Sequence, residues 1–204
     1  MDVTEQKPQF GVNYDVGYDA FTSHPRDFLT AGIDWYERWD ALPGVPPASH
    51  AIKIVGEDLT IEALEHGIVY GKLSGYLNDP LCALMVRKPV QYTPDMAARM
   101  LKEAQSHLGE KYNYFLIAMM AIGNSYIGHW IDQKFSDGKF TSWLEKLADS
   151  KRRDICSEFV ARVDNEMVEL RDRSVLRLPP YRITPILLIG DPVIYEPGTI
   201  ELIP

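Results

Sequence analysis

The stretch RDICSEFVARV, residues 153–163, predicts a helix with one buried face and a cysteine at its start. Phe159, Val160 and Val163 recur at i, i+1 and i+4, which is the spacing of an apolar stripe on an α-helix. Asp154 precedes them and is a residue type that often caps a helix N-terminus. The stretch therefore predicts a helix that packs on a core and begins near residue 155.

Cys156 falls at the start of this predicted helix, with Ser157 and Glu158 in the first turn. The positive end of a helix stabilises a thiolate and so lowers the pKa of a thiol. A thiol of low pKa beside a base is a nucleophile for acyl transfer. Cysteines also occur as small buried apolar residues. A base and an orienting acceptor elsewhere in the chain must decide between these two interpretations.

The rest of the chain predicts an α+β protein in which a small antiparallel sheet, built early, packs on helices that come later. Apolar periodicity and turn residues predict the elements. The expected strands are 16–21, 49–55, 60–63, 68–70, 81–87 and 186–195, the last broken at 190–192; the expected helices are 27–39, 93–109, 112–122, 124–135, 141–147 and the helix at Cys156. No linker divides the chain, so we expect one domain over 1–204, with a helical insertion at about 123–152.

Charge and composition exclude several classes of protein. The 204 residues carry a formal net charge of −8, which disfavours binding to nucleic acid. The longest strictly apolar run, Phe115–Ile122, is far shorter than the ~20 residues of a membrane span. The two cysteines, Cys82 and Cys156, show no zinc-site spacing with histidines, and Cys82 reads as a buried strand residue. We expect no metal, no cofactor and no membrane insertion, and the lack of a secretory signal predicts a cytoplasmic protein.

Histidine is the usual base for a nucleophilic cysteine, and the chain has five. His50 opens a predicted strand, which holds a side chain more rigidly than a loop does, although a histidine at a strand end is also commonly structural. The others lie in a loop before proline, in a polar turn, at an exposed helix end, and on a helix beside a tryptophan: His24, His66, His107 and His129. His50 is the candidate base.

The third member of such a site is an acceptor that orients the imidazole. Glu62, on the strand after His50, is one candidate. A tight hairpin centred on Glu57 and Asp58 sets His50 nearer Glu65, and Glu62 reaches His50 only with strong twist, a bulge or a wider turn. The spacing leaves the choice between Glu62 and Glu65 open.

The order and spacing of five short motifs resemble the circularly permuted NlpC-type cysteine hydrolases, the YiiX-like group of the papain-like fold. In the permuted group the histidine strand comes first and the cysteine helix last. The matching segments are Ser49-His50, Ile61-Glu62-Ala63, Gly109-Glu110-Lys111-Tyr112, Cys156-Ser157-Glu158-Phe159-Val160 and the Thr184-Pro185 entry to a last strand.

The resemblance implies a permuted papain-like fold with Cys156 as nucleophile, His50 as base and Glu62 as the acid that orients it. Tyr112 would lie beside the thiol, near the oxyanion. The implied reaction is cleavage of an amide bond through an acyl-enzyme, with a peptide, a cell-wall fragment or an isopeptide as substrate. Two alternatives remain: a lipid acyltransferase or thioesterase of the retinol acyltransferase type, with an acyl pocket in the apolar segment 115–143, and a non-catalytic binding module.

Overall fold

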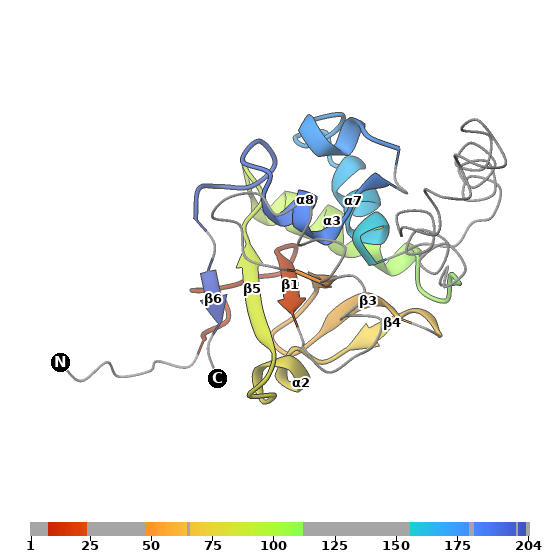
Figure 1. Cartoon of the computed structure of the whole chain (residues 1–204). Helices are drawn as coiled ribbons and strands as arrows, with labels where there is room; N and C mark the ends of the chain where they lie inside the picture. Colours follow the sequence, from red (N-terminus) through yellow and green to blue (C-terminus); the bar gives the residue numbers. More distant parts are fainter. Residues whose placement is uncertain are drawn as a thin grey trace, which may run out of the picture.

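The computed structural model describes residues 8–23, 48–64, 66–111, 156–179, 182–198 and 200–202. In these ranges six strands form one antiparallel sheet in the order β4-β3-β2-β1-β5-β6. Helices α3, α7 and α8 lie together beside the sheet, and α2 lies at the end of β5 that is farther from them (Figure 1). The elements are β1 (Asp19–Ser23), β2 (His50–Ile54), β3 (Thr60–Leu64), β4 (Gly67–Gly71), α2 (Leu73–Leu77), β5 (Ala83–Arg87), α3 (Pro94–Ser106), α7 (Cys156–Asn165), a 3-10 turn (Ser174–Arg177), α8 (Pro185–Ile189) and β6 (Ile200–Leu202). The prediction of a mixed protein with a small antiparallel sheet and a few helices is confirmed.

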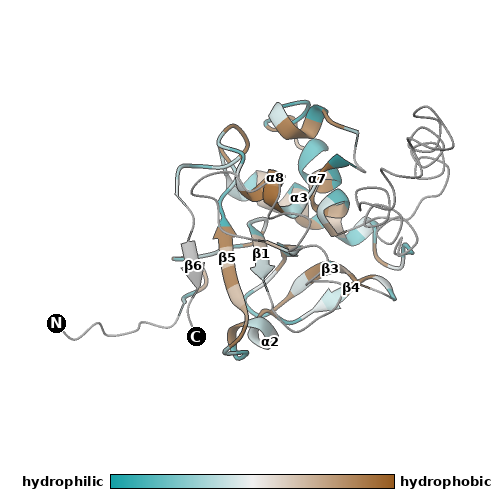
Figure 2. Ribbon diagram, viewed as in Figure 1, coloured by the Kyte–Doolittle hydropathy of each residue, from teal (hydrophilic) through white to brown (hydrophobic). Residues whose placement is uncertain are grey.

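Both faces of the central strands are buried, which explains why apolar side chains occur on both faces of each strand. Successive side chains of a strand point to opposite faces. Ala51 of β2 and Val55, which follows the strand, belong to the core cluster that includes α3, α7 and α8, whereas Ile52 and Ile54 belong to the cluster that includes Leu73 of α2. Apolar residues accordingly follow β5 and β3 and parts of the helices (Figure 2).

Helix α7 begins at Cys156, as the sequence predicts, and packs on β2 and β3. Phe159, Val160 and Val163 are fully buried in the core cluster that α7 shares with the sheet, α3 and α8, so the predicted stripe is a buried face of the helix. Ser157 is also buried, and its hydroxyl donates to the Ile183 carbonyl at 2.5 Å. The first turn of α7 is therefore held on both sides, by the sheet and by the segment before α8.

A buried lysine joins α7 to the two central strands. Lys53 lies opposite Asp19 in the β1–β2 register, and its ammonium contacts the Asp19 carboxylate and, at 2.5 Å, Asp164 Oδ1 of α7. All three side chains are inaccessible to solvent. Burial lowers the pKa of Lys53, but the carboxylates of Asp164 and Asp19 outweigh it and raise the pKa above the ordinary value. The lysine therefore stays charged between its partners.

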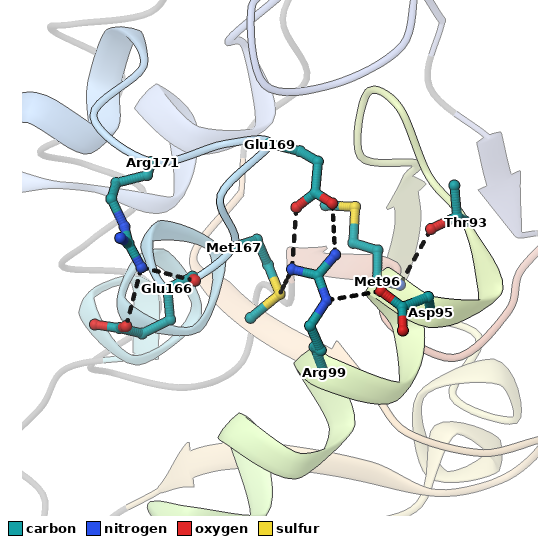
Figure 3. A network of polar contacts seen from close by, with 8 residues as sticks. All are labelled: Thr93, Asp95, Met96, Arg99, Glu166, Met167, Glu169 and Arg171. Atoms are coloured by element: carbon teal, nitrogen blue, oxygen red, sulfur yellow. Dashed lines mark hydrogen bonds and ion pairs between the residues drawn. The ribbon is translucent and has the colours of Figure 1, made fainter.

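A second polar network ties α3 to the turn after α7 (Figure 3). Arg99 donates through both terminal nitrogens to Glu169, at 3.2 Å and 2.5 Å, and through Nε to Asp95 at 3.0 Å. This network is partly exposed, so it contributes about 0–1 kcal/mol per pair. The Arg99 network links these elements at the surface, whereas the Lys53 cluster links β1, β2 and α7 in the interior.

The predicted last strand at 186–195 is wrong, because Pro185–Ile189 forms helix α8. The Thr184 hydroxyl caps this helix by accepting from the Leu187 N–H at 3.3 Å, and Pro185 occupies the first turn, where a missing N–H costs nothing. This cap outweighs the strand propensity of the isoleucines. Of the remainder, Tyr195 makes an isolated bridge to Pro89.

Three smaller expectations also differ. Helix α2 at Leu73–Leu77 was not predicted, β1 covers Asp19–Ser23 rather than 16–21, and Cys82 precedes β5 instead of lying within it. The predicted helices 27–39, 112–122, 124–135 and 141–147, and the insertion at about 123–152, lie outside the described residues. Within the described ranges, no helix has both the length and the apolar content needed to cross a membrane.

Replacing Lys53 with methionine should destabilise the fold strongly. The change leaves Asp19 and Asp164 buried without a cation, and breaking a buried ion pair on one side costs about 3–5 kcal/mol. Urea unfolding measures the loss. Lys102→Met, on the exposed face of α3, is the matched control and should change stability by less than about 0.5 kcal/mol. Equal unfolding midpoints for the two variants would contradict the role given to Lys53.

Candidate active site

His50, at the first position of β2, is hydrogen-bonded to Glu62 of β3. The imidazole Nε2 lies 2.9 Å from Glu62 Oε2. The His50 side chain is 17% exposed and that of Glu62 is 2% exposed, so the carboxylate lies behind the imidazole. Of the two acidic residues left open by the spacing, Glu62 is the one that contacts His50; Glu65 lies outside the described residues.

The register of the β2–β3 hairpin explains how Glu62 reaches His50. Ile52 pairs with Glu62, so His50 and Glu62 point to the same face and are diagonal neighbours. The turn is wider than a two-residue loop, with the Val55 N–H donating to the Leu59 carbonyl at 2.9 Å. In a hairpin centred between 57 and 58, Glu62 would pair with Lys53 and lie on the face away from His50. The observed register differs by one residue and therefore brings Glu62 to the face of His50.

The Glu62 carboxylate is held by three donors. His50 and the Tyr76 hydroxyl of α2 both contact Oε2, and the Thr60 hydroxyl donates to Oε1 at 3.2 Å. Burial raises the pKa of Glu62, but the hydrogen bonds from His50, Tyr76 and Thr60 and the charge of the imidazole outweigh it and lower the pKa. Glu62 therefore remains an ionised acceptor although it is almost completely buried.

Gly71 of β4 leaves the space that this carboxylate occupies. A Cβ on Gly71 would lie 1.7 Å from Glu62 Oε1 and 2.6 Å from the Thr60 hydroxyl. Gly71 lies opposite Thr60 in the β3–β4 register, so the missing side chain opens the sheet next to the acid. Only glycine fits here without moving Glu62.

Cys156 meets His50 at the junction of α7 and β2. The residue is 4% exposed, and its thiol lies close enough to the His50 imidazole for each group to shift the pKa of the other. Since His50 Nε2 faces Glu62, Nδ1 is the nitrogen left for the thiol. Burial raises the pKa of Cys156, but the imidazole and the backbone N–H groups of Ala51 and Ser157 lower it below the usual thiol range.

The imidazole of His50 responds in the opposite direction. Burial lowers its pKa, while the Cys156 thiolate and the Glu62 carboxylate, one on each side, raise it to about 10. A thiol of lowered pKa and an imidazole of raised pKa form a thiolate–imidazolium pair over the neutral pH range. Such a pair supplies a nucleophile and a proton donor in contact, which is the requirement for acyl transfer.

Two other residues considered from the sequence, Cys82 and His107, do not join this group, and His24 and His129 lie outside the described residues. Cys82 has its pKa raised to about 11 by burial and by Asp79, so it remains a neutral thiol. His107 is buried rather than exposed, between Glu110 at 3.0 Å and Glu103 at 3.2 Å. Among the described residues, no group of three His, Cys, Asp or Glu side chains could hold a metal ion.

Tyr112, expected near the oxyanion, lies outside the described residues. The segment that leads to it is described. Gly109 donates to the Ile68 carbonyl at 2.9 Å, and the Ile68 N–H donates to the Glu110 carbonyl at 2.8 Å, so this segment docks on β4. The first residues of the Gly109–Tyr112 motif are thus hydrogen-bonded to β4, the strand beside the one that carries Glu62.

No family model matches the chain. No curated protein matches it either. The interpretation of the site therefore depends on its own geometry and on the chemistry of its residues.

Three residues that support Glu62 were missed in the sequence: Thr60, Gly71 and Tyr76. Thr60 was detectable, since it lies two positions before Glu62 and a strand places both side chains on one face. Gly71 reads as an ordinary strand end. Tyr76 gives no local signal, because its contact depends on a five-residue helix that the periodicity did not predict.

Gly71→Ala should displace the carboxylate of Glu62 and weaken its hold on His50. The imidazolium then loses stabilisation, so the alkylation midpoint of Cys156 should rise by roughly one pH unit. The measurement is the rate of iodoacetamide labelling against pH. Gly75→Ala in α2 meets no atom within 4 Å and should leave the midpoint unchanged. An unshifted midpoint in a folded Gly71→Ala protein would show that this space is not needed.

His50→Ala should raise the pKa of Cys156 above the ordinary thiol value, because burial then acts without the imidazole. Labelling of Cys156 at pH 7 should slow by at least about tenfold. Peptide mass spectrometry follows both cysteines at once, and Cys82 should stay unlabelled in either protein. His66→Ala, at an exposed position, is the control. Faster labelling of Cys82 than of Cys156 would reverse the assignment of the reactive thiol.

Proposed function

We propose that this protein is a cysteine hydrolase with Cys156 as nucleophile, His50 as acid and base, and Glu62 as the orienting acid. The observation that carries the proposal is the continuous contact from Cys156 through His50 to Glu62. These residues come from α7, β2 and β3, and the packing of α7 on both strands brings them together. A purely structural cysteine needs no such chain of contacts.

In the proposed reaction the Cys156 thiolate attacks the carbonyl carbon of an amide, forming a C–S bond and an oxyanion. In this proposal the positive end of α7 stabilises the oxyanion, since the first N–H groups of a helix have no partner within it. Collapse of the intermediate breaks the C–N bond, and the His50 imidazolium gives its proton to the departing amine.

Water then resolves the thioester. His50, now neutral, takes a proton from the water as the oxygen attacks the acyl carbon. The C–S bond breaks, the acid leaves, and the thiolate–imidazolium pair is restored. Glu62 keeps the imidazole in one orientation throughout, because Nε2 remains bound to Oε2 while Nδ1 exchanges the proton.

Amides are the proposed substrates, since a raised imidazole pKa suits protonation of an amine leaving group. The chain order also favours the permuted papain-like architecture, because β2 and β3 with His50 and Glu62 precede α7 with Cys156. The apolar segment 115–143 of the lipid alternative lies outside the described residues.

Incubation with peptide and cell-wall amides, and separately with short-chain phospholipids, tests the proposal. We expect hydrolysis of at least one amide and a transient acyl adduct on Cys156 in acid-quenched samples. Cys156→Ala should abolish both, whereas Cys82→Ser should keep both, since its thiol stays neutral. A fatty-acyl adduct without amide turnover would favour the acyltransferase. A Cys156 midpoint near the unperturbed value, without any adduct, would favour the binding module.

A further inference from the structure

The hydroxyl of Tyr76 and the imidazole of His50 converge on the same oxygen of Glu62. His50 Nε2 lies 2.9 Å from Oε2, and the Tyr76 hydroxyl donates to that same Oε2. The two rings are neighbours, with centroids 6.4 Å apart and an interplanar angle of 37°. Thr60 binds the other oxygen, so the two oxygens have different partners.

The position of Tyr76 is built into the hairpin that brings Glu62 to His50. Asp58, in the β2–β3 turn, accepts from the Ser74 N–H at 2.6 Å and from its hydroxyl at 3.0 Å. Leu73 is fully buried on the same side of the sheet as Ile52. Helix α2 is thus held at its first turn by the turn residue and by the core, which directs Tyr76 to the acid.

We propose that Tyr76 is a positioning residue that acts through Glu62: by sharing Oε2 with His50, it limits how strongly the carboxylate holds the imidazole proton. This inference rests on the proposed function, since it concerns the same His50 and Cys156. It adds a fourth side chain to the site and a control on the proton affinity of the base.

The surrounding charges make Tyr76 a donor and never a competing base. Burial, the Glu62 carboxylate and the Cys156 thiolate raise the pKa of its phenol, so the proton stays on the oxygen. Among the described residues, the groups that face this part of the site are His50, Glu62, Thr60, Tyr76, Cys82 and Cys156. The negative charge on Oε2 is therefore divided between two donors, and only one of them belongs to the base.

The division matters for the second half of the reaction. Once the thiolate has become a thioester, Glu62 is the remaining charge that holds a proton on His50. Deacylation needs the neutral imidazole, so an acid that bound the imidazolium too strongly would slow it. Tyr76 keeps part of the charge on Oε2 occupied and allows His50 to act as a base at lower pH.

Tyr76→Phe tests this role because it removes one donor and keeps the ring. Glu62 stays in place through Thr60 and His50, and its Oε2 then serves the imidazole alone. The alkylation midpoint of Cys156 should fall by about half to one pH unit, because the imidazolium that stabilises the thiolate becomes more stable. The acetyl-enzyme formed from p-nitrophenyl acetate should deacylate with a midpoint that is higher by a similar amount.

Two matched variants complete the experiment. Tyr92→Phe removes a phenol that donates to the Val16 carbonyl at 2.8 Å, away from Glu62, and should leave both midpoints unchanged. Thr60→Val removes the donor to Oε1, which His50 does not touch, and should cause a smaller shift than Tyr76→Phe. An unchanged or raised alkylation midpoint in Tyr76→Phe would overturn the inference while the proposed function stands. A wild-type midpoint at or above the usual thiol value would instead remove the proposed function itself.

Discussion

The fold depends on one buried cation, Lys53, which lies between carboxylates from a neighbouring strand and from helix α7. Apolar packing alone allows a helix to rotate or slide on a sheet, since hydrophobic contact has no direction. An ammonium between Asp19 and Asp164 allows few such arrangements, because any other leaves a charge unpaired in the interior. The cluster therefore selects one orientation of α7 from those that the apolar stripe permits.

The same contact sets the distance over which the candidate site is assembled. Asp164 lies eight residues after Cys156, and Lys53 lies three residues after His50. Eight helical residues span about 12 Å and three strand residues about 10 Å, so the two intervals nearly match. Helix α7 thus meets β2 at two places, with ionic contact between Asp164 and Lys53 at one and the thiol beside the imidazole at the other. The ion pairs of Lys53 with Asp19 and Asp164 therefore help to place the Cys156 nucleophile.

How much could be predicted from the sequence depends on how far apart along the chain the interacting residues lie. The helix from Cys156 and the strand that opens at His50 follow from local apolar spacing, and both are confirmed. The strand expected at 186–195 failed because a Thr-Pro cap was read as a strand entry. The pairing of Glu62 with His50 depends on a single residue of register, and Tyr76 depends on a short helix whose stability comes from Asp58 and the core. Spacing along the chain does not encode such contacts.

Strand β2 carries both polar networks, but on opposite faces. Lys53 points with Ala51 and Val55 toward α7, whereas His50 shares the face of Ile52 and Glu62. The sheet itself lies between the two sets of charges, and the Lys53 cluster bears on the thiol by holding α7 to β2 through Asp164. Glu62, Thr60, Gly71 and Tyr76 affect the thiol through the imidazole instead. One strand can therefore hold a charged core that fixes geometry and a charged site whose proton affinity is adjusted separately, because alternation sends neighbouring side chains into different surroundings.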